Sequence, residues 1–129
     1  MTLAYELQAA VQAALAGEAA LSGWAVTDGD PAGETAPFIS IGPDMIVAAG
    51  AVDVELKRCR FAVTLWSAGE AAALLKPAMA AAERAVLVVP AALASGRVAR
   101  MSFLRSYTRR DARAGLVRGE VEFEAMLQG

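Results

Sequence analysis

The fold is decided by residues 58–86, which read RCRFAVTLWSAGEAAALLKPAMAAAERAV. In the first nine residues, side chains alternate as in a strand with one buried face, formed by Cys59, Phe61, Val63 and Leu65. Ser67 precedes Glu70 by three residues, which predicts a capping box at the start of a helix. Apolar residues then follow at helical spacing, namely Ala71, Leu74, Leu75, Ala78, Met79, Ala82 and Val86. A strand that leads into a helix with one apolar stripe predicts a sheet with the helix packed on its core face.

Pro77 lies well inside this helical pattern. A proline in a helix interior removes one backbone hydrogen bond, so the sequence predicts a bend at Lys76 with the apolar stripe kept on both sides.

The rest of the chain supplies a second helix and further strands. Thr2 is a suitable cap for a first helix, whose shared face carries Leu3, Leu7, Ala10, Val11, Ala14 and Leu15. Residues 24–26 and 38–42 are short strand candidates, the second entered through Pro37 and ended by Pro43. Residues 45–56 fit a strand, a loop or both.

Residues 97–108 and 116–127 predict two long strands joined by a short polar connection, and hence an antiparallel hairpin. On the first strand, Arg105 interrupts the apolar face that contains Phe103 and Tyr107. On the second, Glu120, Glu122 and Glu124 alternate with apolar residues, so Arg100 or Arg105 is expected opposite a glutamate. The predicted fold is α+β, an antiparallel sheet of about four strands with two helices on one face and a long C-terminal β-hairpin.

Composition sets limits on the class of protein. The 129 residues fit one domain spanning 1–129 with one core. The longest uncharged apolar run, residues 85–96, is short and contains Pro90, so no membrane span is predicted, and the N-terminus lacks the features of a secretory signal. A single cysteine excludes an internal disulfide, and the position of Cys59 on the apolar face predicts a buried core thiol. We expect a soluble protein that is made in the cytoplasm.

Acidic and basic residues are separated along the chain. Residues 1–56 contain eight acidic and no basic residues, whereas residues 57–118 contain all twelve basic residues and three acidic ones. Separation of this kind suits a nucleic-acid-binding face or an assembly with unlike edges. Alternatively, the two signs intermingle once the chain is folded.

Motifs for catalysis are absent from the sequence. There is no histidine, Cys59 has no histidine to activate it, and the glycines match no phosphate-binding fingerprint. We therefore expect no enzyme, no cofactor and no metal. The arginines at 109, 110 and 113 are the best candidates for contact with nucleic acid, although Asp111 interrupts them and the protein is acidic overall, which favours a solvated or protein-binding loop.

Several segments together resemble the small tail-terminator, or tail-completion, proteins of long-tailed phages and gene transfer agents. They are APFISIG at residues 36–42, RFAVTLWS at 60–67 with the Gly-Glu pair that follows, SYTRRD at 106–111 and LVRGEVEF at 116–123. Their order and spacing cover nearly the whole chain.

The resemblance implies a non-enzymatic virion component, assembled in the host cytoplasm, that forms a hexameric ring on the head-proximal end of the tail tube. Its partners would be other copies of itself, the tail tube protein and a neck or head-completion protein, with DNA only as passing cargo. Closure of a ring uses unlike edges, so we expect Asp53 and Glu55 to face basic residues of the next subunit, drawn from Arg97, Arg100, Arg109, Arg110 and Arg113. Glu120, Glu122 and Glu124 line a central channel in one hypothesis and a solvated outer face in another. Another neck ring component and a small nucleic-acid-binding module are the alternative functions.

Overall fold

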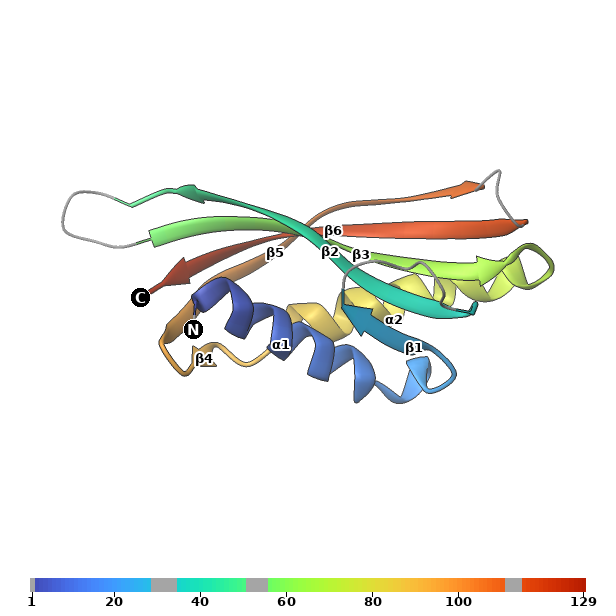
Figure 1. Ribbon diagram of the computed structural model, residues 1–129, viewed down its shortest axis with the longest axis horizontal. Helices are drawn as coiled ribbons and strands as arrows, with labels where there is room; N and C mark the ends of the chain where they lie inside the picture. Colours follow the sequence, from blue (N-terminus) through green and yellow to red (C-terminus); the bar gives the residue numbers. More distant parts are fainter. Residues whose placement is uncertain (1, 29–34, 51–55, 111–114) are drawn as a thin grey trace.

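The computed structural model describes residues 2–28, 35–50, 56–110 and 115–129. The elements are, in chain order, α1 (Leu3–Ala16), η1 (Ala19–Leu21), β1 (Ala25–Asp28), β2 (Phe38–Ala48), β3 (Leu56–Ala68), η2 (Gly69–Leu74), α2 (Leu75–Leu87), β4 (Ala92–Leu93), β5 (Gly96–Arg110) and β6 (Leu116–Gln128). The strands form one sheet in the order β1-β2-β3-β6-β5-β4, and the two α-helices lie on the same face of it (Figure 1). The predicted α+β class with two helices on one face is confirmed.

The prediction of about four antiparallel strands is wrong in number and in direction. The described part of the chain contains six strands, and β1 runs parallel to β2, so the sheet is mixed. The sequence signal missed β4 because it is only two residues long. The sequence predicted a short strand in the β1 region but not that it runs parallel to β2. Strand direction depends on the path of the connecting segment, which local sequence does not reveal.

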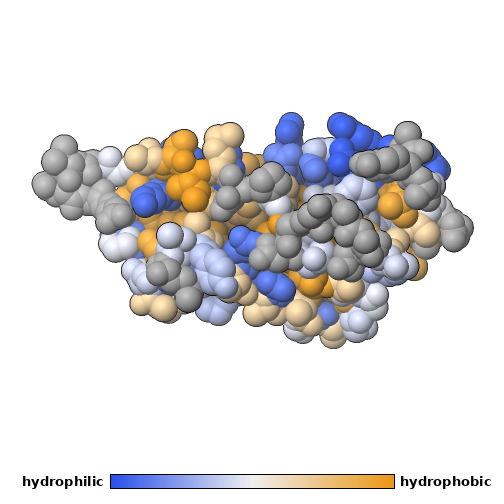
Figure 2. All heavy atoms as spheres, in the orientation of Figure 1, coloured by the Kyte–Doolittle hydropathy of each residue, from blue (hydrophilic) through white to orange (hydrophobic). Residues whose placement is uncertain are grey.

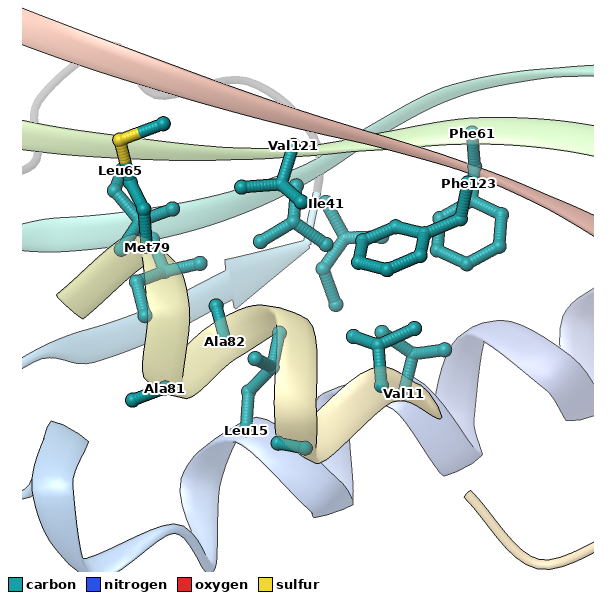
Figure 3. Close-up of a cluster of buried hydrophobic side chains, with 14 of the residues drawn as sticks. Val11, Leu15, Ile41, Phe61, Leu65, Met79, Ala81, Ala82, Val121 and Phe123 are labelled. Carbon is teal, nitrogen blue, oxygen red and sulfur yellow. The ribbon is translucent and has the colours of Figure 1, made fainter. Parts of the chain in front are cut away.

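The core lies between the helices and the inner face of the sheet (Figure 3). Leu7, Val11 and Leu15 follow each other at four-residue spacing on α1 and are all buried, as the apolar stripe predicts. Thr2 caps this helix, since its hydroxyl accepts a hydrogen bond from the Tyr5 amide at 3.2 Å. From the sheet, β3 and β6 contribute directly paired residues, and Phe61 stacks on Phe123 with ring centroids 5.4 Å apart.

The chain forms strand where the sequence predicts the start of a helix. Ser67 lies within β3, is buried, and donates a hydrogen bond to the Ala68 carbonyl at 3.3 Å. The chain continues as the 3-10 helix η2, and α2 starts only at Leu75 with no side-chain cap. Strand pairing with β6 extends through Ala68, so the α-helix starts later than the sequence predicts. The side chain of Glu70, the other half of the predicted capping box, is outside what the structure describes.

The late start of α2 also replaces the predicted bend at Lys76. Pro77 is the third residue of α2, where its missing N–H has no partner in the preceding turn, so the helix accommodates it without an interior kink. Instead, the helix changes from 3-10 to α two residues earlier. The predicted stripe holds at Leu75, Ala78, Met79, Ala82 and Val86, which are buried, whereas Leu74 is 64% exposed.

Pro43 does not end the second predicted strand. β2 continues to Ala48, and its pairing with β3 shifts register between Gly42 and Met45. Such an irregularity removes the need for a ladder hydrogen bond at the proline, which explains why the strand tolerates it. Residues 45–48 are therefore strand.

The predicted C-terminal hairpin is confirmed, with β5 and β6 paired along almost their full length. Two register shifts occur on β5, one between Val98 and Arg100 and one between Phe103 and Arg105. Each shift adds one extra residue to β5. The side chains after it therefore point to the opposite face from the one that regular alternation would give them. Arg105 and Tyr107 consequently share the face of Glu122 and Glu120, and the predicted assignment of Tyr107 to the apolar face with Phe103 is wrong.

Candidate functional site

The face of the sheet opposite the helices, here called the outer face, is rich in arginine. The strand registers place seven described arginines on it, against three glutamates. The arginines are Arg58 and Arg60 of β3, Arg97, Arg100, Arg105 and Arg109 of β5, and Arg118 of β6. Hydrophilic side chains gather along the right half of the upper edge of Figure 2, over the later part of β5, whereas hydrophobic ones occupy its left half. The described outer face is thus basic, although the whole protein carries a net charge of −2.

The three glutamates of β6 are bound by neighbours on the adjacent strands. Arg60 Nε lies 2.9 Å and Arg58 Nε 3.6 Å from carboxylate oxygens of Glu124. On the other side, Arg105 Nε lies 3.0 Å from Glu122, which is the cross-strand pair that the sequence predicted for Arg105. Arg100, the other residue proposed for such a pair, lies opposite Met126.

Glu120 interacts with a tyrosine. The Tyr107 hydroxyl donates a short hydrogen bond to Glu120 Oε2 across the β5–β6 ladder. This hydrogen bond, together with burial and the charges of Glu120 and Glu122, raises the pKa of the Tyr107 phenol. The Arg105 and Arg109 guanidinium groups each lie 5.6 Å from the centroid of the Tyr107 ring, close enough for cation–π attraction.

A small aromatic cluster occupies the outer face where β2, β3 and β6 meet. Phe38 stacks on Trp66 with ring centroids 5.7 Å apart, and Trp66 Nε1 donates a hydrogen bond to Ser40 Oγ at 3.3 Å. Arg118, directly opposite Trp66 on β6, lies over the indole at 5.7 Å. The sheet is therefore buried on both faces at this point, which the alternating pattern of β3 did not reveal.

The structure divides the predicted contact arginines between the two ends of β5. Arg97 and Arg100 are near its start, Arg109 and Arg110 at its end, and all four are exposed. On β6 the partners of Arg97 and Arg109 are Gln128 and Arg118, so at about 3.3 Å per residue these two arginines are roughly 33 Å apart. Asp53, Glu55 and Arg113, the other predicted contacts, lie outside the described residues.

The end of the sheet that carries Arg97 also carries the residues that flank segment 51–55. The Ala49 amide donates to the Leu56 carbonyl at 3.0 Å, Leu56 pairs with Gln128, and Gln128 pairs with Arg97. Arg109 and Arg110 are at the opposite end, next to residue 115 where the β5–β6 hairpin returns. Arg109 and Arg110 are thus far from the described residues that flank segment 51–55.

Within the described ranges, no group of three or more His, Cys, Asp or Glu side chains is placed to hold a metal ion. In the same ranges, no helix has the length and apolar character needed to cross a membrane. Two grooves border α2. One of about 350 Å³ lies between α2 and β5, lined by Lys76, Met79, Glu83, Ser106 and Thr108 among others.

Comparison with known proteins gives a family match and a structural match for this chain. The family described as "Tail completion protein gp17" matches residues 4–128, nearly the whole chain. The chain belongs to the tail completion protein family. A solved chain from "Virion of native gene transfer agent (GTA) particle" has the same fold, with a TM-score of 0.85, 32% sequence identity, and coverage of 99% of this chain and 98% of that one. None of the curated proteins matches the chain.

The resemblance drawn from the sequence is thus confirmed, and this tail completion protein is a structural component of a virion tail or neck. Sequence reasoning missed the Trp66–Arg118 contact on the outer face. The alternation of side chains along β3 could have revealed this contact. Phe61, Val63 and Leu65 face the core, so Trp66, which follows Leu65, must face the other side of the sheet.

Proposed function

We propose that the protein forms a ring, most simply a hexamer, that caps the head-proximal end of the tail tube and joins the tail to the neck without catalysing a reaction. The observation that carries the proposal is the match of residues 4–128 to the tail completion family, together with the similarity to a chain of a gene transfer agent virion. In such a ring, each copy contacts two others, and the tail tube protein and a neck protein bind its two sides.

The free edge of the sheet supports a tiled assembly. β4 pairs only with Gly96 and Arg97, and the Val98 amide donates to the Ala91 carbonyl at 2.7 Å. In the described part of the chain, no strand pairs with the outer edge of β5 from Ala99 to Arg110. An exposed edge of this length is a site where another chain adds contacts, and in a monomer it would favour uncontrolled pairing. A ring that covers the edge removes that hazard.

The charge distribution supports head-to-tail contact between copies. A cyclic ring joins two different surfaces of each subunit, so opposite charge on the two surfaces favours closure. We propose that Asp53 and Glu55 of one copy face arginines of the next. Arg109 and Arg110 suit this role better than Arg97 and Arg100, because they lie at the end of β5 that is remote from Ala49 and Leu56, on either side of segment 51–55. Arg113 is proposed with them from the sequence alone.

We also propose an orientation for the glutamate strand. If Glu120, Glu122 and Glu124 faced the channel, their charge would reduce adhesion of passing DNA. However, Glu122 is paired with Arg105 and Glu124 with Arg58 and Arg60. These pairs, and the excess of arginine on the face, favour the alternative in which this face lies against protein or solvent.

Native mass spectrometry of the purified protein at low and high salt tests the ring. We expect a closed oligomer whose population falls as salt rises, because screening weakens contacts between exposed charges. Negative-stain images of the same sample should show rings. A protein that stays monomeric at every concentration and salt would contradict the proposal.

Binding assays separate the alternative functions. A terminator should bind tail tube protein, whereas another neck ring component should bind only neck proteins. A nucleic-acid-binding module requires salt-sensitive affinity for duplex DNA that falls on substitution of Arg109 and Arg110.

A further inference from the structure

Arg109 and Arg118 lie directly opposite each other on the outer face at the hairpin end of the sheet. Like charges at directly opposed positions of an antiparallel pair destabilise the ladder. Elsewhere on this face the chain avoids the problem, because Arg58, Arg60 and Arg105 all have carboxylate partners. Among the residues that the structure describes, neither Arg109 nor Arg118 forms an ion pair.

Both guanidinium groups are held against aromatic rings. Arg109 lies over Tyr107 at 5.6 Å, and Arg118 lies over Trp66 at 5.7 Å. Trp66 is itself fixed by Phe38 and by its hydrogen bond to Ser40, and it is only 9% exposed. Stacking on a ring restricts a guanidinium and leaves its N–H edge available for a planar acceptor, so less conformational entropy is lost on binding.

Arg118 carries an unused donor. Its Nε is buried and has no hydrogen-bond partner among the described residues. A buried donor without a partner costs free energy, which a ligand can recover by accepting from it. The nearest carboxylate on the face, Glu120, accepts instead from the Tyr107 hydroxyl.

We propose that Arg109 and Arg118, backed by Tyr107 and Trp66, form a site for a carboxylate, and that its occupant is an acidic side chain from residues 1–56 of a second copy of this chain. Carboxylates match the planar, bidentate geometry of guanidinium groups. The second copy is the occupant because residues 1–56 contain eight acidic and no basic residues, and an anion from that region neutralises the like-charge pair. This inference rests on the proposed ring and names its contact.

The test compares assembly of the wild type with that of R109Q/R118Q by sedimentation velocity at several concentrations, in low salt and without DNA. We expect the double variant to need about tenfold more protein for half-assembly, the loss of one charge-assisted contact per interface. R105Q is the matched control, because Arg105 lies on the same strand and face but is paired with Glu122 of its own copy. It should assemble within about twofold of the wild type.

A structural role for the two arginines predicts a different result. Because the substitutions remove a like-charge pair, R109Q/R118Q monomers should unfold at the same temperature as the wild type or higher. R118K keeps the charge but loses the planar fork, and it should weaken assembly in the same direction as R118Q. A double variant that assembles poorly only because it unfolds would overturn the inference.

Fluorescence gives a direct readout of the site. The chain has two tryptophans, so a W24F background leaves Trp66 as the sole tryptophan, which is excited selectively at wavelengths that tyrosine does not absorb. The emission wavelength of Trp66 in W24F should shift as rings form. In W24F/R118Q, brought to the same degree of assembly by raising the protein concentration, it should not shift.

The outcomes separate this inference from the proposed function. Rings that form normally in R109Q/R118Q, with no change in Trp66 emission, overturn the carboxylate site and leave the ring intact. A wild type that never assembles overturns both. If the double variant instead loses only salt-sensitive binding to a fluorescent DNA duplex, the site takes phosphate, and the proposed occupant is wrong.

Discussion

Gly119 of β6 lies directly under Met79 of α2, so close that a Cβ at this position would overlap with Met79 Sδ and stand 3.0 Å from Met79 Cγ and Cε. The absence of a side chain on β6 is what lets α2 pack against the sheet at this point. We therefore expect G119A to lower the free energy of unfolding by about 1 kcal/mol, the low end of the range for overpacking, because the flexible end of Met79 borders a groove and can shift. Denaturant unfolding followed by circular dichroism measures this.

A double-mutant cycle identifies the contact responsible. M79A alone should cost about 2–5 kcal/mol because it opens a cavity, yet in the M79A background the additional cost of G119A should nearly vanish. Costs that simply add would show that Gly119 is required for backbone reasons and not for the approach of Met79.

Tyr107 and Glu120 form the polar cross-strand pair at the hairpin end. The pKa of Tyr107 is raised above the ordinary value of 10.0, so the folded state holds the phenolic proton more tightly than the unfolded state does. The stabilisation is complete below the unfolded pKa and is lost as pH rises through the folded pKa. Relative to Y107F, the wild type should be more stable at neutral pH by roughly 0.5 kcal/mol, and this advantage should disappear in strong alkali. Y5F, which removes the hydroxyl of an exposed tyrosine on α1, is the matched control.

Glu6 links α1 to the turn between β4 and β5. Its carboxylate accepts from the Ser95 amide at 2.8 Å and from the Ser95 hydroxyl at 2.6 Å, and these hydrogen bonds lower the pKa of Glu6 below 4.5. For a lowered carboxyl pKa, the stabilisation is present above the unfolded pKa and is lost as pH falls through the folded one. E6Q should thus be less stable than the wild type at pH 7, and the two should converge at acidic pH below 4.5.

Urea denaturation at both pH values checks this, with E83Q as a matched loss of one negative charge on the other helix. S95A should reproduce the neutral-pH loss of E6Q. An E6Q defect that persists unchanged at acidic pH would show that the ionised carboxylate contributes nothing.

The elements that sequence predicts well here are those with local signals. The stripe on α1, the inward alternation of Phe61, Val63 and Leu65, and the hairpin of β5 and β6 all follow from periodicity alone. The errors arise where long-range pairing decides. Ser67 is of a residue type that often starts a helix, but it pairs with Val117 on β6, and α2 begins only at Leu75. Pro43 is of a residue type that often ends a strand, but it lies where the β2–β3 register shifts.

The candidate site was predictable in composition and not in arrangement. The sequence predicts Arg97, Arg100, Arg109 and Arg110 as contacts with another subunit, and this stays a prediction. Their separation into the two ends of one long strand emerges only from the structure. The Arg109–Arg118 pair could not be predicted from the sequence either, because it depends on the strand register. Leu104 is an extra residue in β5, so each later side chain of β5 points to the opposite face from the one that regular alternation predicts.

This dependence on Leu104 leads to a test by deletion. Leu104 lies between Phe103, paired with Phe123, and Arg105, paired with Glu122, and its side chain is 40% exposed. Deleting Leu104 leaves both pairs in a regular ladder, so we expect a folded protein within about 1 kcal/mol of the wild type that keeps the Arg105–Glu122 pair. Deleting Ser106 instead should carry Tyr107 and Arg109 to the inner face and cost much more stability, because Arg109 would then be directed toward the core. Equal loss of stability in the two deletions, measured by thermal unfolding, would show that the register shift at Leu104 is not what aligns this face.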